Sequence, residues 1–370
     1  MPVPLLDLKA QHSLIRDEVV ASVMKVIDDQ LFILGEPVER LEKMVAELSQ
    51  TRYAIGCANG TDALLLALRA LDVGHGDEVI TTPFTFFATA GTIHNVGAIP
   101  VFVDIEPRTF NIDPKAAAAA VGSKSKAVVP VDLFGQMAPI EEIRRLIPSL
   151  PIIEDAAQSI GASRQIGGTR VMAGEAATIG TFSFFPSKNL GGYGDGGMMV
   201  TQDEALAMRL KRLRVHGGAK QYFHDEVGYN SRLDALQAAV LVAKLPHLSH
   251  WSAGRRANAA YYDSAFADVP EVQTPYLDPA NESIFNQYTI RVQRRDALQG
   301  YLKEKGIGSA VYYPLPLHLQ PCFQYLGYRE GQCPESEKAA KEVLSLPVFP
   351  ELTSAQLDEV IGTVRAFYGR

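Results

Sequence analysis

Apolar and polar residues follow two different rhythms along the first half of the chain. Residues 13–27 and 37–48 place apolar side chains at every third or fourth position, which predicts two amphipathic helices. Short apolar runs then alternate with helical stretches. Strands are predicted at 53–57, 78–81, 99–103, 127–131 and 152–154, and helices at 62–71, 86–96 and 140–146. This alternation is typical of βα units and predicts an α/β fold with a mostly parallel sheet covered by helices on both faces.

The alternation of strands and helices ends after residue 176. Residues 177–185 and 197–201 have the pattern of apolar strands, but a glycine-rich stretch joins them where a helix would be expected. Helices are predicted next at 204–216 and 231–244, and Pro246 provides a stop. We therefore predict a large domain over residues 1–245 and a smaller C-terminal α+β domain over residues 246–370. The pattern of the smaller domain predicts helices near 252–266, 295–305 and 354–368, a strand at 287–292 and a proline-rich loop at 312–321.

Composition excludes several classes of protein. The 370 residues are 47% hydrophobic and 21% charged, which are ordinary values for a globular protein with a substantial core. Acidic residues outnumber basic ones by 42 to 35, and the net charge of −7 repels polyanions. The charge therefore argues against a nucleic-acid partner.

Cysteines, histidines and the first residues indicate the cellular setting. Cys57, Cys322 and Cys333 form no CxxC pair, and the histidines show no metal-ligand spacing, so we expect neither a disulfide framework nor a metal site. The first residues lack the basic and apolar regions of a signal peptide. No run approaches the roughly eighteen apolar residues of a membrane span. These features predict a cytoplasmic protein.

Asp155 and Lys188 are the first candidates for chemistry. Asp155 follows the predicted strand at 152–154, and ligands of open α/β sheets bind at the carboxyl ends of the strands. The alternative for Asp155 alone is a helix N-cap. Lys188 follows the apolar strand at 177–185. Placing a charged lysine beside an apolar strand costs solvation free energy, so a lysine at this position indicates a functional role. Lysine forms Schiff bases with carbonyl groups, and a pyridoxal phosphate enzyme needs such a lysine together with a carboxylate at the pyridine nitrogen.

Two loops could hold the phosphate and the ring of such a cofactor. Residues 58–62 lie between a strand and a helix, so that backbone N–H groups and the Thr61 hydroxyl would face an anion at the helix N-terminus. The aromatic residues at 84–87 follow the next strand and could cover a ring, although a core cluster is the alternative. The glycines at 192–197 match GxGxxG but precede a strand, which argues against a dinucleotide site.

Motifs spread over essentially the whole chain carry a family resemblance. They are LLDL at 5–8, LG at 34–35, NGTDAL at 59–64, GDEVI at 76–80, EDAAQS at 154–159, SFFPSK at 183–188 and YNSRLD at 229–234. With these motifs the chain resembles the sugar-nucleotide aminotransferases of the DegT/DnrJ/EryC1/StrS type. The resemblance implies the type I fold of pyridoxal-phosphate-dependent transferases, in which a large domain is followed by a smaller C-terminal domain.

The resemblance also implies a role for individual residues. Lys188 would carry the cofactor as a Schiff base and move the proton, and Asp155 would pair with the pyridinium nitrogen. The other implied cofactor contacts are Gln158 at the phenolic oxygen, Phe86 on the ring face, Gly60, Thr61 and Ser183 at the phosphate, and Asn230 reaching in from the neighbouring subunit of a homodimer. The implied substrate contacts are His216 and Arg232 on the nucleotide-sugar side, and Tyr313 and His318 in the sugar pocket.

The residues around Lys188 indicate which reaction the resemblance implies. Related dehydratases carry histidine at this position, so lysine favours transamination. Family members that aminate the 4-position commonly read close to HITTGEGG after the lysine, whereas residues 189–197 here read NLGGYGDGG, as in the 3-amino branch. Tyr312 departs from the family, because a histidine often precedes the Tyr-Pro pair.

The predicted function is therefore transfer of an amino group from L-glutamate to a nucleotide-linked keto sugar, with a 3-keto NDP-hexose as the expected acceptor. The product would be an amino sugar for a cell-surface polysaccharide or a glycosylated metabolite. A 4-keto acceptor is one alternative. A non-catalytic regulatory protein that binds pyridoxal phosphate is another, although no basic helix-turn-helix segment precedes the domain. A cofactor-free carbohydrate enzyme is disfavoured because Glu154 and Asp155, as neighbours on a strand, point to opposite faces.

Overall fold

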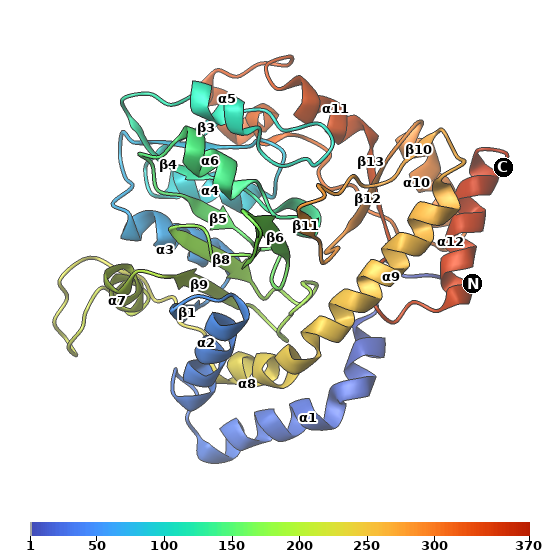
Figure 1. The fold of residues 1–370 in the computed structure, drawn as a ribbon. Coiled ribbons are helices and arrows are strands. Elements are labelled where there is room, and N and C mark those ends of the chain that lie inside the picture. The colour runs from blue at the N-terminus through green and yellow to red at the C-terminus, as the bar shows by residue number, and fades with distance from the viewer. Residues whose placement is uncertain (1) are drawn as a thin grey trace.

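The computed structural model describes residues 2–370 and is built around a twisted central sheet (Figure 1). Its strands are β1 (Tyr53–Cys57), β2 (Glu78–Thr81), β3 (Ile99–Phe102), β4 (Ser125–Val129), β5 (Ile153–Asp155), β8 (Ile179–Ser183) and β9 (Gly197–Thr201). Parallel bridges from Val128 to Ile152 and from Val131 to Asp155 join two ladders into the order β1-β9-β8-β5-β4-β2-β3. Only β9 runs antiparallel to its neighbours within this sheet, as its ladders to β1 and β8 show. The predicted α/β class is confirmed.

Helices cover both faces of the sheet because side chains alternate along its strands. On β9, Met198 and Val200 belong to the core under α2 (Glu36–Leu48) and α8 (Ala235–Lys244), whereas Met199 belongs to the core under α3 (Gly60–Ala70) and α7 (Glu204–Leu213). The remaining helices around the sheet are α1 (Leu8–Asp29), α4 (Phe87–Asn95), α5 (Pro114–Ala119) and α6 (Ile140–Leu146). Helix α1 packs on the outer side of α8.

The C-terminal third forms a second core. Helix α9 (Leu248–Phe266) runs from the end of α8 to this core, where α12 (Ser354–Phe367) packs beside it (Figure 1). The other elements here are β10 (Val272–Gln273), β12 (Tyr288–Val292), β13 (Val343–Leu346), α10 (Arg295–Glu304) and α11 (Pro334–Glu342). Val3, from the start of the chain, is fully buried in this core and forms a bridge with Ile307.

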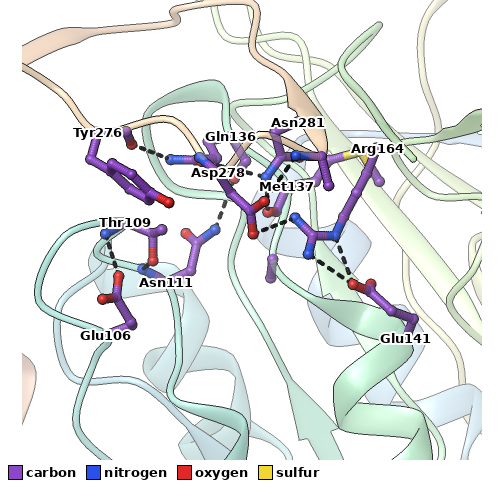
Figure 2. A network of polar contacts seen from close by, with 12 residues as sticks. Glu106, Thr109, Asn111, Gln136, Met137, Glu141, Arg164, Tyr276, Asp278 and Asn281 are labelled. Atoms are coloured by element: carbon purple, nitrogen blue, oxygen red, sulfur yellow. Dashed lines mark hydrogen bonds and ion pairs between the residues drawn. The ribbon is translucent and has the colours of Figure 1, made fainter. Parts of the chain in front are cut away.

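A polar network fastens residues 276–282 to the first part of the chain (Figure 2). The Gln136 side chain donates to the carbonyl of Tyr276 at 3.0 Å and accepts from the N–H of Asp278 at 2.7 Å. Arg164 forms ion pairs of 2.8 Å with Glu141 and 3.0 Å with Asp278. Strand β11 (Asn281–Glu282) extends the hairpin of β6 (Ser163–Ile166) and β7 (Thr169–Met172). The second part of the chain therefore contributes β11 to a three-stranded sheet whose other two strands, β6 and β7, belong to the first part.

Most predicted elements differ from the structure only at their ends, and side-chain caps explain two of the differences. The helix predicted at 13–27 begins at Leu8 because Asp7 accepts from two N–H groups of the first turn. The helix predicted at 231–244 begins at Ala235 because Asp234 accepts from the N–H of Gln237 at 2.8 Å. The β6–β7 hairpin, β10, β11, β13 and α11 were not predicted, because their short segments show no strong periodicity. The short 3₁₀ turns are η1 (Leu133–Gly135), η2 (Leu245–His247), η3 (Leu317–Leu319) and η4 (Pro321–Leu326).

Within residues 2–370, none of the helices combines the length and the apolar content needed to cross a bilayer. In the same part of the chain, no group of three or more His, Cys, Asp or Glu side chains is arranged to hold a metal ion.

Candidate active site

Three strands bring their carboxyl ends to one edge of the central sheet. Cys57 at the end of β1 and Ser183 at the end of β8 both pair with Gly197 of β9, so they lie at the same level. Asp155 ends β5 next to Thr181 of β8. The loops that follow these strands carry Gly60, Gln158 and Lys188. The sheet therefore gathers residues that lie far apart in the sequence.

Gly60 and Ser183 form a tight junction at this edge. Gly60 is the first residue of α3, and Asn59 caps that helix by accepting from the N–H of Asp62 at 2.8 Å. A Cβ on Gly60 would lie 2.6 Å from the Cβ of Ser183, a contact that real Cβ atoms do not make. Glycine therefore allows the N-terminus of α3 to approach the end of β8. The N–H groups of the first helical turn face outward beside Ser183 and the exposed Thr61, an arrangement that suits a phosphate.

Asp155 is buried and Lys188 is partly exposed, and each charge affects the pKa of the other. Burial raises the pKa of the Asp155 carboxyl, whereas a hydrogen bond from Thr89, another from the N–H of Ala157 and the charge of Lys188 lower it. Burial lowers the pKa of Lys188 to about 8, although the charge of Asp155 opposes that shift. Near neutral pH the lysine is thus much closer to its nucleophilic, uncharged form than a solvated lysine is.

Gln158 is held in one orientation. Its amide oxygen accepts from the N–H of Phe134 at 2.7 Å, and its amide nitrogen donates to the hydroxyl of Tyr313 at 3.3 Å. The Tyr313 ring lies 6.3 Å from the ring of Phe86, which is 58% exposed. Burial raises the pKa of Tyr313, so its hydroxyl stays protonated. Three of the predicted site residues thus meet on one side of the edge.

Comparison with known proteins identifies the family. Residues 13–365 match the model of the DegT/DnrJ/EryC1/StrS aminotransferase family. The chain belongs to this family.

Individual members of the DegT/DnrJ/EryC1/StrS family are similar over almost their whole length. A "pleiotropic regulatory protein" of Geobacillus stearothermophilus is 52% identical over 100% of this chain and 99% of its own. A UDP-N-acetyl-3-dehydro-alpha-D-glucosamine 3-aminotransferase of Acidithiobacillus ferrooxidans is 45% identical over 98% of this chain and 97% of its own. The crystal structure of S. venezuelae DesV in complex with a ketimine intermediate superposes with a TM-score of 0.96 at 40% identity, covering 100% of this chain and 99% of that one. These matches confirm the predicted fold and aminotransferase class.

His216 and Arg232, which the family resemblance assigns to the substrate, lie near Asn230, which it assigns to the cofactor of the neighbouring subunit. His216 and Asn230 are exposed, and the backbone bridge between Val215 and Asn230 holds them at the base of a surface loop that spans residues 217–228. Within residues 2–370, the Asn230 side chain makes no hydrogen bond. Arg232 is half-buried and follows Ser231, whose hydroxyl accepts from the N–H of Ala58 beside Gly60.

His318 does not line an open pocket in this chain. Its side chain is completely buried, and its Nε2 lies 3.0 Å from the carboxylate of Glu337. The ring also packs edge-on against Tyr328. The predicted sugar-pocket role therefore finds no exposed surface here, because this pairing turns His318 into the interior of the proline-rich loop. Tyr313, by contrast, accepts a hydrogen bond from Gln158 at the edge of the sheet.

The sequence pattern predicts no role for several polar residues that lie near the site. Thr89 donates to Asp155, and Asn189 donates to the carbonyl of Ile284 at 3.0 Å while it accepts from Asn286 at 2.7 Å. Asp132 and Glu154 are fully buried, and burial raises the pKa of both carboxyl groups. The position of Thr89 beside the aromatic residues at 84–87 was the one available signal. Long-range pairs such as Asn189 with Asn286 leave no local pattern.

Proposed function

We propose that this chain is a pyridoxal-phosphate-dependent enzyme that transfers the amino group of L-glutamate to a keto sugar nucleotide, with a 3-keto NDP-hexose as the acceptor. The observation that carries the proposal is the pair of Asp155 and the low-pKa Lys188 at the carboxyl edge of the sheet. The Acidithiobacillus relative is a 3-aminotransferase, and the sequence after Lys188 is NLGGYGDGG; both observations support the 3-position.

The residues at the sheet edge fit the cofactor. Gly60 lets the N-terminus of α3 come close to Ser183, where a Cβ would collide with the serine side chain. Asp155 is a buried carboxylate, and the amine of Lys188 can form a Schiff base with an aldehyde. Bound pyridoxal phosphate would supply an electron sink through its protonated ring. Its proposed contacts are Lys188, Asp155, Gln158, Phe86, Gly60, Thr61 and Ser183, together with Asn230 of a second subunit.

The chain's own groups then have separate tasks. Asp155 provides the negative charge that keeps a ring nitrogen protonated. Lys188, with its pKa of about 8, can take up and return a proton at the substrate carbon near neutral pH. The Gln158 amide is oriented by the N–H of Phe134, which donates to its oxygen, and by Tyr313, which accepts from its nitrogen. His216 and Arg232 are proposed to bind the nucleotide part of the substrate, and Tyr313 the sugar.

The active enzyme is proposed to be a cytoplasmic homodimer with shared sites. The loop at 217–228 exposes large apolar side chains, with Tyr222 at 85% and Val227 at 82% exposure, next to the unpaired Asn230 side chain. Such exposure in one chain favours a covering partner. Each subunit is proposed to consist of a large domain over residues 1–245 and a small domain over residues 246–370. The N-terminal residues around Val3 pack on the small domain.

Two alternatives follow from particular observations. A 4-keto sugar nucleotide would need the same residues around Lys188, so the acceptor position rests on the sequence after the lysine. The name of the Geobacillus relative favours a regulatory protein that binds pyridoxal phosphate without turnover. An intact lysine, carboxylate and phosphate cradle favour catalysis over this second alternative.

One assay tests the proposal. Purified protein loaded with pyridoxal phosphate is incubated with L-glutamate and a panel of 3-keto and 4-keto dTDP-, UDP- and GDP-sugars, and the products are read by mass. We expect an amino sugar from a 3-keto substrate, and none with Lys188→Ala. Turnover of 4-keto sugars alone would show that the enzyme aminates carbon 4 of the sugar and not carbon 3. A protein that binds the cofactor and aminates no member of the panel would support the regulatory alternative.

A further inference from the structure

Two buried threonines stand behind Asp155. The hydroxyl of Thr89 donates to Oδ2 of Asp155 at 2.8 Å, and the hydroxyl of Thr85 lies 3.0 Å from that of Thr89. Both threonines are almost fully buried, with exposures of 1% and 2%. Solvent water therefore does not compete with either hydroxyl for its hydrogen bond, and both groups remain next to Asp155 in the folded protein.

The direction of both hydrogen bonds follows from the number of protons available. An ionised carboxylate only accepts, and a threonine hydroxyl carries a single hydrogen. Because Thr89 gives its hydrogen to Asp155, the hydrogen between the two threonines must come from Thr85. Both O–H dipoles therefore point toward the carboxylate, and each strengthens the other.

Thr89 provides the strongest of the opposing effects on a carboxylate that burial would otherwise neutralise. Burial raises the pKa of Asp155; the hydrogen bond from Thr89 lowers it most, followed by the N–H of Ala157 and then the charge of Lys188. The other titratable groups that act electrostatically with Asp155 are Tyr313 and Asp132. Tyr313 stays neutral, and Asp132 adds a negative charge that opposes ionisation of Asp155.

The two oxygens of Asp155 are not equivalent. Oδ2 accepts the short bond from Thr89, whereas Oδ1 accepts only a 3.3 Å bond from the N–H of Ala157. Oδ1 therefore has the greater capacity left for a cationic N–H donor. Thr85 and Thr89 also flank Phe86 at the start of α4, so one segment orders both the carboxylate and the aromatic ring.

We propose that Thr89, oriented by Thr85, is a positioning residue that keeps Asp155 ionised and turns its Oδ1 toward the ring nitrogen of the cofactor, an inference that rests on the proposed function. Thr89 acts through Asp155 and requires no contact of its own with the cofactor. Its contribution should consequently vanish for a ligand that has no ring nitrogen.

The test compares pyridoxal phosphate with its 1-deaza analogue, in which carbon replaces the ring nitrogen. Dissociation constants are measured by absorbance titration for the wild type, Thr89→Val, Thr89→Ser and Thr85→Val. Valine has the shape of threonine without the hydroxyl, and serine keeps the hydroxyl. We expect Thr89→Val to weaken binding of pyridoxal phosphate roughly tenfold or more, the effect of one charge-assisted hydrogen bond, and to leave binding of the analogue unchanged. Thr89→Ser should bind pyridoxal phosphate more tightly than the analogue to the same degree as the wild type does. Thr85→Val should show a smaller difference in affinity between the two ligands.

The outcomes separate this inference from the proposed function. Equal loss for both ligands in Thr89→Val would mean a structural role and would overturn the inference, as would unchanged binding of both. If Thr89→Val fails to fold, as judged by circular dichroism, Thr85→Val decides the question by the same comparison. A wild type that binds neither ligand would overturn the proposed function itself.

Discussion

Lys188 shows how strongly one residue depends on its surroundings. Burial brings its pKa to about 8, from 10.5 for a solvated lysine, and Asp155 limits the shift by stabilising the charged form. Since the uncharged amine is the nucleophile, the reactive fraction near neutral pH is far larger than that of a surface lysine. The type and position of this residue were predictable from the sequence, but its pKa depends on contacts that the sequence pattern does not contain.

Capture of pyridoxal phosphate by the cofactor-free protein should therefore depend on pH. The amine is charged below its pKa, so the rate should rise with pH up to about 8 and level off above it. In Asp155→Asn the charge that raises the lysine pKa is gone, and the midpoint should move to lower pH. Stopped-flow absorbance measures both profiles. Identical midpoints for the two proteins would show that Asp155 and Lys188 are not coupled.

At the scale of elements, the site depends on how closely the N-terminus of α3 approaches the end of β8. Gly60→Ala would place a Cβ 2.6 Å from Ser183, and backbone atoms of the strand are nearby. We expect a loss of about 1–3 kcal/mol in the free energy of unfolding, together with weaker binding of pyridoxal phosphate.

The matched control for Gly60→Ala is Gly300→Ala in α10. Nothing lies within 4 Å of a Cβ at Gly300, so alanine there should stabilise the helix by roughly 0.5–1 kcal/mol. Urea denaturation measures both variants. Equal effects of the two substitutions would contradict a tight junction between α3 and β8.

A second element-scale prediction concerns two buried acids, Asp132 in the loop after β4 and Glu154 within β5. Burial raises the pKa of Glu154 well above its usual value, so folding favours the protonated acid. The stability from this proton is fully present at low pH and is lost as the pH rises through the raised pKa. Glu154→Gln, which keeps a neutral donor, should therefore gain stability relative to the wild type as the pH rises, by at most about 1.4 kcal/mol per pH unit.

Urea denaturation of both proteins at pH 5, 7 and 9 tests the prediction for Glu154. The buried pair contributes through Asp132 as well, whose pKa burial raises to about 6. The difference between the variant and the wild type reports the proton of Glu154 together with the effect of its charge on Asp132, because all other acids are common to both proteins. A difference that does not change with pH would show that Glu154 does not carry the proton.

At the scale of the whole molecule, segments that are distant in the sequence contact one another and join the two parts of the chain. Val3 is buried in the C-terminal core, and residues 276–282 dock on the loop around Gln136 and on Arg164 (Figure 2). Next to Lys188, Asn189 contacts Ile284 and Asn286, so the lysine loop is tied to the segment that enters β12. Movement of the C-terminal part is therefore linked to the lysine loop.

The proposed sharing of sites between subunits predicts complementation. Lys188→Ala and Asn230→Ala proteins should each be nearly inactive alone. A hybrid dimer carries both defects in one site and an intact second site, so mixing with subunit exchange should restore up to about one quarter of wild-type activity. Amino sugar formation measures the recovery, and native mass spectrometry of tagged subunits confirms the exchange. No recovery after proven exchange would contradict a site built from two chains.

The sequence by itself determined the elements and the chemistry that local patterns encode. The βα alternation and the residues Lys188, Asp155 and Gly60, each placed after a predicted strand, were recognisable from their positions in the chain. Tertiary structure alone decided the β6–β7–β11 sheet, the burial of His318 against Glu337 and the hydrogen bond of Thr89 to Asp155. The physical reason is that each of these depends on segments that are distant in the sequence and meet only when the core forms.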